Sequence, residues 1–290
     1  MEEFVVRLRT LTPVWTGGVD RDNKVAREHG IVGSLRWWYE ALVRGLGGFA
    51  CDPTSADRCM LDEEAYRSEG LEAGLRHVCP ACRLFGCGGW ASKFHLLLTD
   101  AEGNPSLSLN DRDIAFQIHF LNRFPWEDEE RWLMNRVFTL IDRYGAIGGK
   151  TTLKPPVRPD YGQVRVEENL PAPDLTVAQV RHWLQGMLQA SPDMQRRRAA
   201  QSPEIPRLDL FFFKTGAWLD IGQMNELVRV DRSGFLAGRR GVSKKVFSFQ
   251  TTKRFWGYAA DERMLNRVLE ALARMGFREI KTGKEVLNAL

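Results

Sequence analysis

An α+β fold of two β-α-β-β-α-β units, with a cysteine-rich insertion in the first, is predicted for this chain of 290 residues. The chain opens with an alternating segment followed by an amphipathic one, and its second half reads as a degenerate copy of this pattern. All five cysteines fall between residues 51 and 87. The length suits two compact domains or one large one.

The first unit opens with a strand and a helix. Apolar and polar residues alternate along residues 4–9, which indicates a half-buried strand. A polar loop follows as far as Gly30, and Ser34 is the expected N-cap of a helix that ends at the glycines of residues 45–48. Its apolar stripe consists of Leu35, Trp38, Tyr39, Leu42 and Leu46.

The remaining elements complete the first unit. Residues 90–99 and 116–120 have strand patterns, and residues 127–143 form a helix with acidic residues in its first turn, where the helix dipole favours them. Residues 163–166 can form the last strand. The resulting order is the ferredoxin-like arrangement, which RNA-recognition modules also use.

A proline-containing linker at residues 171–174 precedes the second unit. We therefore predict domains at residues 1–170, with the insertion at 51–89, and at 171–290. The second domain is expected to contain a helix over residues 177–188, a buried strand at 208–213, two strands within 246–258, and a last helix from Asp261 to Gly276.

Charge is segregated along the chain, although the net charge is only +4. Residues 232–260 contain seven basic and no acidic residues, and residues 143–158 contain four basic and no acidic residues. Single runs of this kind are usually solvated surfaces. Two acid-free basic segments that both contain glycine favour a surface that binds a polyanion such as RNA or DNA.

Membrane insertion and secretion are not expected from the sequence. The longest apolar stretches are shorter than the roughly 18 residues of a membrane-spanning helix. The first residues run directly into a strand pattern and do not resemble a signal peptide. We expect a cytoplasmic protein.

The five cysteines suggest a metal site. An odd number in a cytoplasmic protein argues against a disulfide framework, and a Cys-x₂-Cys pair is a good zinc half-site. The alternative is that the cysteines are small buried apolar residues. The expected zinc ligands are Cys79, Cys82, Cys51 and Cys59, with His77 as a substitute.

The loop at residues 145–152 (GAIGGKTT) is similar to a phosphate-binding loop but lacks its spacing. A P-loop has about four residues between its first glycine and Gly-Lys, whereas Gly145 leaves three before Gly149-Lys150. The segment also follows a helix and runs into two prolines. We therefore expect no bound nucleotide, although the loop amides and Lys150 can bind a phosphate.

A loop aspartate is the one candidate for catalysis. Asp20 and Asp22 lie beside Arg21 and Lys24, so this loop could hold a metal ion for RNA cleavage. The alternative is a polar loop without chemistry, and no Ser-His-Asp set is evident. We therefore expect a non-enzyme, with a metal-dependent endoribonuclease as the alternative.

Two adjacent tryptophans on the first helix cannot both face the core. Trp38 lies on the apolar stripe, whereas Trp37 either packs under the insertion or a domain interface, or stacks on a ligand or subunit. Arg36, close to the expected start of the helix, opposes the dipole there, so we expect a phosphate or an acidic side chain as its partner.

Residues 12–18 (TPVWTGG), 33–38 (GSLRWW) and 79–86 (CPACRLFG) occur in this order. Together they resemble the signature of the RAMP superfamily, whose members build RNA-guided CRISPR effector complexes. The arginine and the paired tryptophans are similar to one branch in particular. That branch is the first-numbered subunit of the type III-B (Cmr) complex, which caps the 3′ end of the guide RNA.

The resemblance implies a non-catalytic role in antiviral defence. It implies guide RNA (crRNA), target RNA and other RAMP subunits as partners, and RNA backbone contacts by the glycine-rich loop after the second helix. Metal sites occur near the cysteine region in some branches. The expected phosphate contacts are Arg21, Lys24, Arg36, Lys93, Lys150, Lys154, Arg158, Arg239, Arg240, Lys244 and Lys245.

Overall fold

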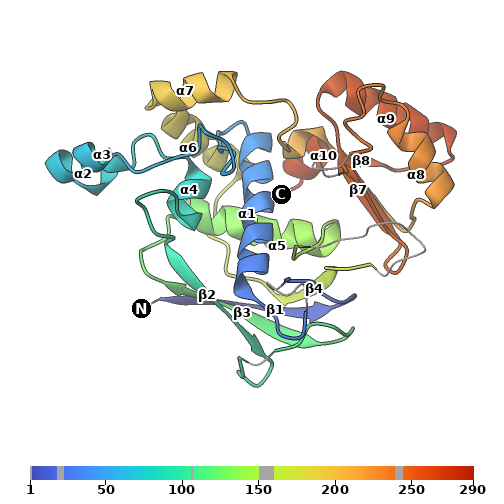
Figure 1. The fold of residues 1–290 in the computed structure, drawn as a ribbon, viewed down its shortest axis with the longest axis horizontal. Helices are drawn as coiled ribbons and strands as arrows, with labels where there is room; N and C mark the ends of the chain where they lie inside the picture. Colours follow the sequence, from blue (N-terminus) through green and yellow to red (C-terminus); the bar gives the residue numbers. More distant parts are fainter. Residues whose placement is uncertain (1, 18–22, 106, 150–159, 239–243) are drawn as a thin grey trace.

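The computed structural model contains two four-stranded antiparallel sheets, with helices between and around them (Figure 1). It describes residues 2–17, 23–105, 107–149, 160–238 and 244–290. Within these residues no helix is long and apolar enough to cross a membrane. The predicted α+β class is confirmed.

The first sheet has the strand order β2-β3-β1-β4. Alternating burial along β1 places one of its faces in the core, as its sequence pattern predicts. The strands are β1 (Glu3–Thr10), β2 (Phe94–Asp100), β3 (Ala115–Asn122) and β4 (Val164–Glu168). Helices α1 (Glu28–Gly45) and α5 (Asp128–Arg143) lie on one side of this sheet (Figure 1). All four predicted strands and both helices of this unit are therefore present.

The second sheet repeats the topology of the first. Its order is β6-β7-β5-β8, which is again second-third-first-fourth when the strands are numbered within the unit. The strands are β5 (Phe211–Thr215), β6 (Val246–Phe249), β7 (Arg254–Tyr258) and β8 (Lys281–Thr282). Helices α8 (Ile221–Val228) and α9 (Glu262–Arg274) belong to this unit. The expectation of a second, degenerate ferredoxin-like unit is confirmed.

Several short elements were not predicted from the sequence. Helix α9 is not the last one, because β8 and α10 (Gly283–Asn288) follow it. The predicted strand at 208–213 begins as a 3₁₀ turn, η1 (Leu208–Leu210). Elements of two to eight residues, α8 included, are too short to show a clear period.

The first helix begins earlier than predicted. It starts at Glu28, and Ser34 lies inside it instead of capping it. A Cβ atom on Gly30 would lie 2.4 Å from the carbonyl oxygen of Thr16, so only glycine allows this turn to approach the preceding segment. Arg36 therefore lies well inside the helix, and the argument that it opposes the helix dipole was wrong.

The cysteine-rich insertion contains three short helices between α1 and β2. These are α2 (Glu63–Glu69), α3 (Leu71–Gly74) and α4 (Pro80–Phe85). Helix α2 has no buried residue, and Figure 1 shows α2 and α3 projecting from the body of the molecule. Helix α4 lies close to α1.

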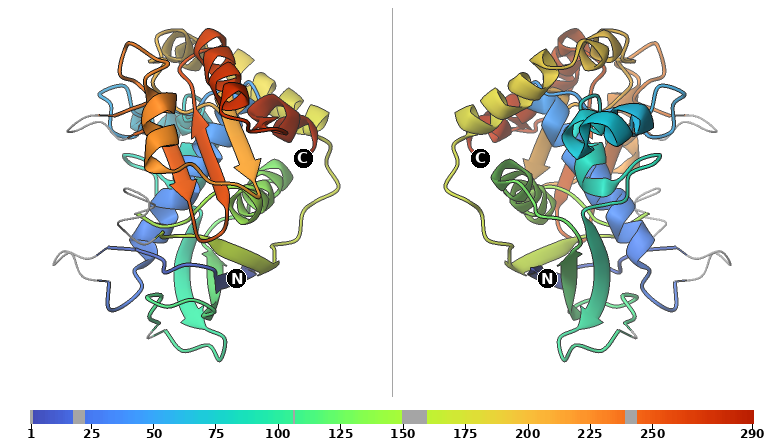
Figure 2. Two further views of the ribbon diagram at one scale, coloured as in Figure 1. Left: turned by 90° about the vertical axis from the view of Figure 1, so that its right-hand side faces the viewer. Right: turned by 90° about the vertical axis from the view of Figure 1, so that its left-hand side faces the viewer.

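A helical connector joins the two sheets. It consists of α6 (Val177–Gln189) and α7 (Pro192–Ala199), of which only α6 was predicted. The two side views in Figure 2 show a long extended stretch leading from β4 to this connector. Helix α7 lies near the end of α1 that is remote from the first sheet (Figure 1).

The paired tryptophans of α1 fill the junction between the two units. The ring of Trp37 lies 5.9 Å from that of Trp256 and 6.0 Å from that of Phe211, both on the second sheet. Trp38 is buried and donates its indole N–H to the carbonyl oxygen of Ala146 at 2.9 Å. Trp37 thus packs at the interface of the two units, as one alternative predicted, and stacking of its half-buried ring on a ligand stays a prediction.

Candidate metal centre and nucleic-acid interface

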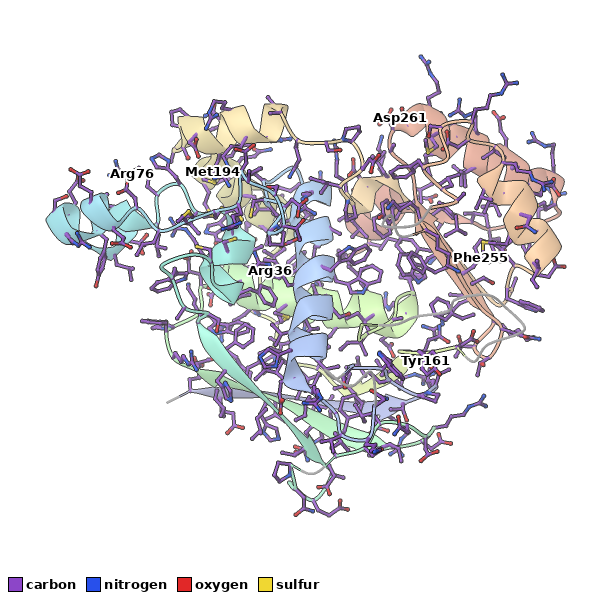
Figure 3. The ribbon with its side chains drawn as sticks, viewed as in Figure 1. Arg36, Arg76, Tyr161, Met194, Phe255 and Asp261 are labelled. Carbon is purple, nitrogen blue, oxygen red and sulfur yellow. The ribbon has the colours of Figure 1, made fainter. Side chains whose placement is uncertain are left out.

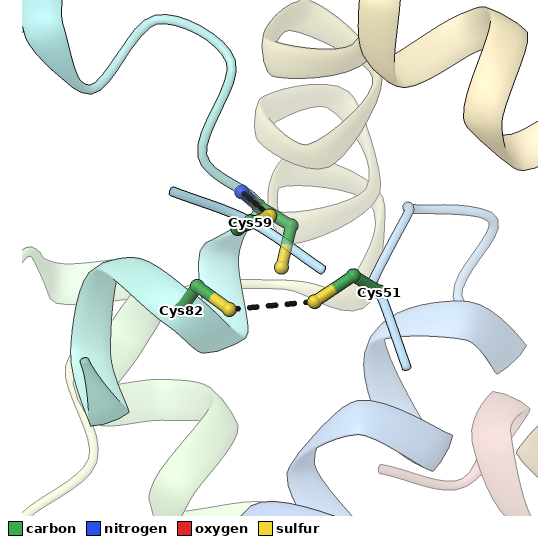
Figure 4. A group of neighbouring side chains, drawn as sticks. Cys51, Cys59 and Cys82 are labelled. Atoms are coloured by element: carbon green, nitrogen blue, oxygen red, sulfur yellow. Dashed lines mark hydrogen bonds between the residues drawn. The ribbon is translucent and has the colours of Figure 1, made fainter. Parts of the chain in front are cut away.

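Four cysteine sulfurs form one compact group (Figure 4). Their Sγ atoms all lie within 4.8 Å of one another, and all four residues are buried. A tetrahedral zinc ion with Zn–S bonds of about 2.3 Å places its sulfurs roughly 3.8 Å apart, so the group fits such an ion after small movements. The group consists of Cys51, Cys59, Cys79 and Cys82, the four residues predicted from the sequence.

Three separate segments supply these sulfurs. Cys79 is the N-cap residue of α4 and Cys82 lies in the helix, so the i, i+3 spacing places both on one face. Cys51 follows the end of α1, and Cys59 lies in the loop before α2. The substitute ligand His77 is not in the group, and its Nδ1 lies 2.8 Å from the hydroxyl of Ser191.

The sulfurs interact with one another and with nearby donors. The Sγ atoms of Cys51 and Cys82 are 3.4 Å apart, and the dashed line between them in Figure 4 marks this contact. The pKa of the Cys59 thiol is lowered by its interaction with the neighbouring thiols of the group. The backbone N–H of Cys79 also points to this sulfur at 3.4 Å. The cluster thus favours a thiolate at Cys59, and a thiolate is the form that binds metal.

Arg36 faces this cluster from the middle of α1 (Figure 3). Its guanidinium donates to the Glu40 carboxylate at 2.8 Å, to the Gly86 carbonyl oxygen at 3.1 Å and to the Cys82 sulfur at 3.0 Å. The acidic partner expected for Arg36 is therefore Glu40. A contact between Arg36 and RNA stays a prediction.

Lys93 lies in a buried ion pair. Its Nζ is 2.8 Å from a carboxylate oxygen of Glu130, whose side chain is fully buried. The same oxygen accepts the backbone N–H of Glu127 at 2.9 Å and so caps α5. Burial raises the pKa of Glu130, and the ammonium of Lys93 opposes this. Lys93 thus has an internal structural partner, and its predicted RNA contact is untested.

The two predicted lysines after the second basic loop are both close to aromatic rings. Lys245 is buried, with its Nζ 5.4 Å from the ring centroid of Phe235, and burial lowers its pKa. The Nζ of Lys244 lies 5.9 Å from the ring centroid of Phe247. Lys24, in the first loop, is exposed.

The other predicted contacts lie outside the described residues, as do both candidate catalytic aspartates. These residues are Asp20, Arg21, Asp22, Lys150, Lys154, Arg158, Arg239 and Arg240. Their described neighbours still locate the ends of the loops. Asp160, after the first basic segment, accepts the backbone N–H of Thr251 at 2.8 Å. Asp160, two residues after the first basic segment, therefore contacts the turn between β6 and β7, which lies within the second segment.

An open groove lies beside these loop ends. It has a volume of about 460 Å³ and runs between α1 and the β6–β7 hairpin. The half-buried rings of Trp37 and Phe247 line it, together with Gly148 and Gly149. The position of Phe247 in this groove was not predicted from the sequence, because nothing in its local pattern relates it to α1.

The chain consists of two ferredoxin-like units that meet at a junction of aromatic rings. The family model of the RAMP superfamily matches residues 7–153, and the chain is a member of that superfamily. A search of curated proteins found no match.

The chain is similar to chains in several solved structures. A chain of the type III-B Cmr-beta complex, solved bound to cognate target RNA and AMPPnP, is 11% identical, with a TM-score of 0.49 over 94% of this chain and 99% of that one. Cmr1 from Pyrococcus furiosus is 10% identical, with a TM-score of 0.45 over 98% and 99%. Csm3 from Methanopyrus kandleri is 15% identical, with a TM-score of 0.33 over 58% and 75%.

Proposed function

We propose that this chain is a non-catalytic RNA-binding subunit of a cytoplasmic type III-B (Cmr) CRISPR ribonucleoprotein. It contacts the 3′ region of the guide RNA and its paired target RNA, beside other RAMP subunits, in antiviral defence. Membership of the RAMP superfamily supports this proposal. The division into domains at residues 1–170 and 171–290 belongs to the same proposal.

The observation that carries the proposal is the groove lined by Trp37 and Phe247. The acid-free segment at 143–158 enters it through Gly148 and Gly149, and the β6–β7 hairpin that forms its other wall belongs to the acid-free segment at 232–260. Basic loops neutralise phosphates, and aromatic rings stack on bases without strong sequence preference. This combination suits RNA whose sequence is read by base pairing and whose backbone is held by protein.

Native purification tests the assignment. The tagged chain, isolated from its source cells, should bring down short guide RNAs and other RAMP subunits together. A matched variant with Lys150→Ala, Arg239→Ala and Arg240→Ala should retain the protein partners with less RNA. Recovery of the tagged wild-type chain free of both RNA and RAMP subunits would contradict the proposal.

We also propose that the four-cysteine group holds a structural zinc ion. Four thiolates complete the tetrahedral coordination and leave no open position for a substrate, which is the pattern of a structural site. The ion would join the end of α1, the loop before α2 and the start of α4. Elemental analysis of protein never exposed to a chelator should find about one zinc per chain. Absence of metal, with reactive thiols in the folded protein, would leave the cysteines as apolar core residues.

A further inference from the structure

Arg197 reaches the cysteine group from the connector helix α7. One terminal nitrogen of its guanidinium donates to the Cys59 sulfur at 3.3 Å and to the Asp57 carbonyl oxygen at 2.6 Å. The other lies 3.4 Å from the His77 carbonyl oxygen and 3.2 Å from the carboxylate of Asp193. Only 10% of the Arg197 side chain is exposed. An arginine on the connector is therefore inserted among the segments that carry the sulfurs.

Arg36 makes the corresponding contact from α1. Its guanidinium is 3.0 Å from the Cys82 sulfur, and 18% of its side chain is exposed. The two arginines thus donate to different sulfurs and come from helices far apart in the sequence. Arginine stays charged at all relevant pH values, so both can face a permanent negative charge.

A buried tetrathiolate centre needs such partners. Zinc bound to four thiolates has a net charge of about −2, and a buried charge is tolerated only where charged or hydrogen-bonding groups compensate it. Outer partners also orient the ligands and are commonly worth about 10–100-fold in metal affinity.

We propose that Arg36 and Arg197 are positioning residues of the metal centre, and that Arg197 thereby couples metal binding to the docking of α7 on the insertion. This inference rests on the zinc site proposed above. Neither arginine needs a phosphate in this role, which separates both from the RNA-binding loops.

The docking of α7 depends largely on polar contacts. Met194 is the only buried residue of the helix. Its flanks are held by the contact of Ser191 with His77 and by Gln201, which donates to the Ala50 carbonyl oxygen at 2.7 Å. Both partners lie next to a cysteine of the group in the sequence: Ala50 directly precedes Cys51, and His77 lies two residues before Cys79. Loss of the metal should therefore loosen α7 more than helices remote from the centre.

The first experiment measures metal affinity by competition with a chromophoric chelator. Arg197→Met should bind zinc about tenfold more weakly or worse. Arg196→Met is the matched control, because Arg196 lies on the same helix with 73% of its side chain exposed, and it should equal wild type. Arg36→Lys and Arg197→Lys keep the positive charge but lose the planar guanidinium, so their zinc affinities should lie between those of wild type and Arg197→Met. They also provide a test of the site if a methionine variant misfolds.

The second experiment measures hydrogen exchange of the α7 amides with and without zinc. Protection of α7 should fall on zinc removal and in zinc-loaded Arg197→Met, while that of α9 stays unchanged. Equal zinc affinity in wild type and all arginine variants would overturn the inference while leaving the zinc site intact. Unchanged α7 protection on zinc removal would overturn the coupling. A wild-type chain that binds no zinc would overturn the metal site and this inference together.

Discussion

Asp160 accepts the backbone N–H of Thr251 at 2.8 Å, and this contact joins the loop after α5 to the turn between β6 and β7. The two residues are 91 positions apart in the sequence. Asp160 is buried, whereas Thr251 is exposed. Beside it, the Thr252 hydroxyl donates to the side-chain oxygen of Gln163. The bond therefore joins Asp160, two residues after the first acid-free basic segment, to Thr251 within the second.

Removal of this acceptor should destabilise the junction. Asp160→Ala removes the acceptor of the Thr251 N–H, and because Thr251 is exposed the loss should be that of an ordinary hydrogen bond, about 0.5–1.5 kcal/mol. Chemical denaturation should show a loss of this size. Asp160→Asn keeps an acceptor oxygen and should lose less. Equal stability of wild type and Asp160→Ala would show that the bond does not hold the loop.

RNA binding should depend steeply on salt. On single strands the logarithm of affinity falls with the logarithm of salt concentration by about 0.7 per neutralised phosphate. Filter binding across a salt series should show such a slope, with little sequence preference. An RNA affinity that does not change with salt concentration would show that the basic segments do not neutralise phosphates.

Loop variants should weaken RNA binding without unfolding the protein. Lys150→Ala, and Arg239→Ala with Arg240→Ala, change residues that the sequence predicts to lie in loops, and they should alter stability by about 0.5 kcal/mol or less. Each lost phosphate contact should weaken all RNA sequences alike and reduce the salt slope by about one unit. Thermal melts on the same preparations provide the control. Unchanged affinity and slope in both variants would show that these loops do not bind RNA.

The buried pair of Lys93 and Glu130 should contribute to stability in a pH-dependent way. Lys93→Met leaves a buried carboxylate without its cation, which costs about 3–5 kcal/mol near neutral pH. Burial already raises the pKa of Glu130 above its usual 4.5, and loss of Lys93 should raise it further. The folded variant then binds a proton at a higher pH than the unfolded chain does. Its deficit should therefore shrink as the pH falls through the raised value toward 4.5.

Urea denaturation at several pH values measures this deficit. The double variant Lys93→Met, Glu130→Gln removes both charges and should recover part of the stability at neutral pH. A deficit of Lys93→Met that is the same at all pH values would show that the carboxylate of Glu130 is not its cause.

The isolated chain should not cleave RNA. No nucleophile or acid–base set is evident in its sequence, and Asp20 and Asp22 are the only candidates we identified. Incubation of labelled RNA with Mg²⁺ or Mn²⁺ should leave it intact. Cleavage that disappears in Asp20→Asn or Asp22→Asn would instead favour the endoribonuclease alternative.

Much of the fold could be predicted because hydrophobic period is a local signal. The alternation in residues 4–9 and the helical spacing of residues 127–143 depend only on near neighbours, and both elements formed as predicted. The four cysteines that come together could be predicted as a candidate metal site because the cysteines are confined to one insertion. The RAMP resemblance likewise rested on short contiguous motifs, and the family match confirms it.

The tertiary structure alone decided what depends on distant surfaces. Gly30 in the first turn of α1 packs closely against Thr16, and Trp37 faces the second sheet, which lies more than 170 residues later in the chain. The sequence did not decide between a phosphate and an internal carboxylate as the partner of Arg36 or Lys93. Both partners need the same positive charge, so the residue type does not distinguish them. The sequence by itself determined the main strands and helices, their order and the four cysteines that come together. Only the packing of one element on another decided which charges are buried, since burial depends on contacts that no local pattern encodes.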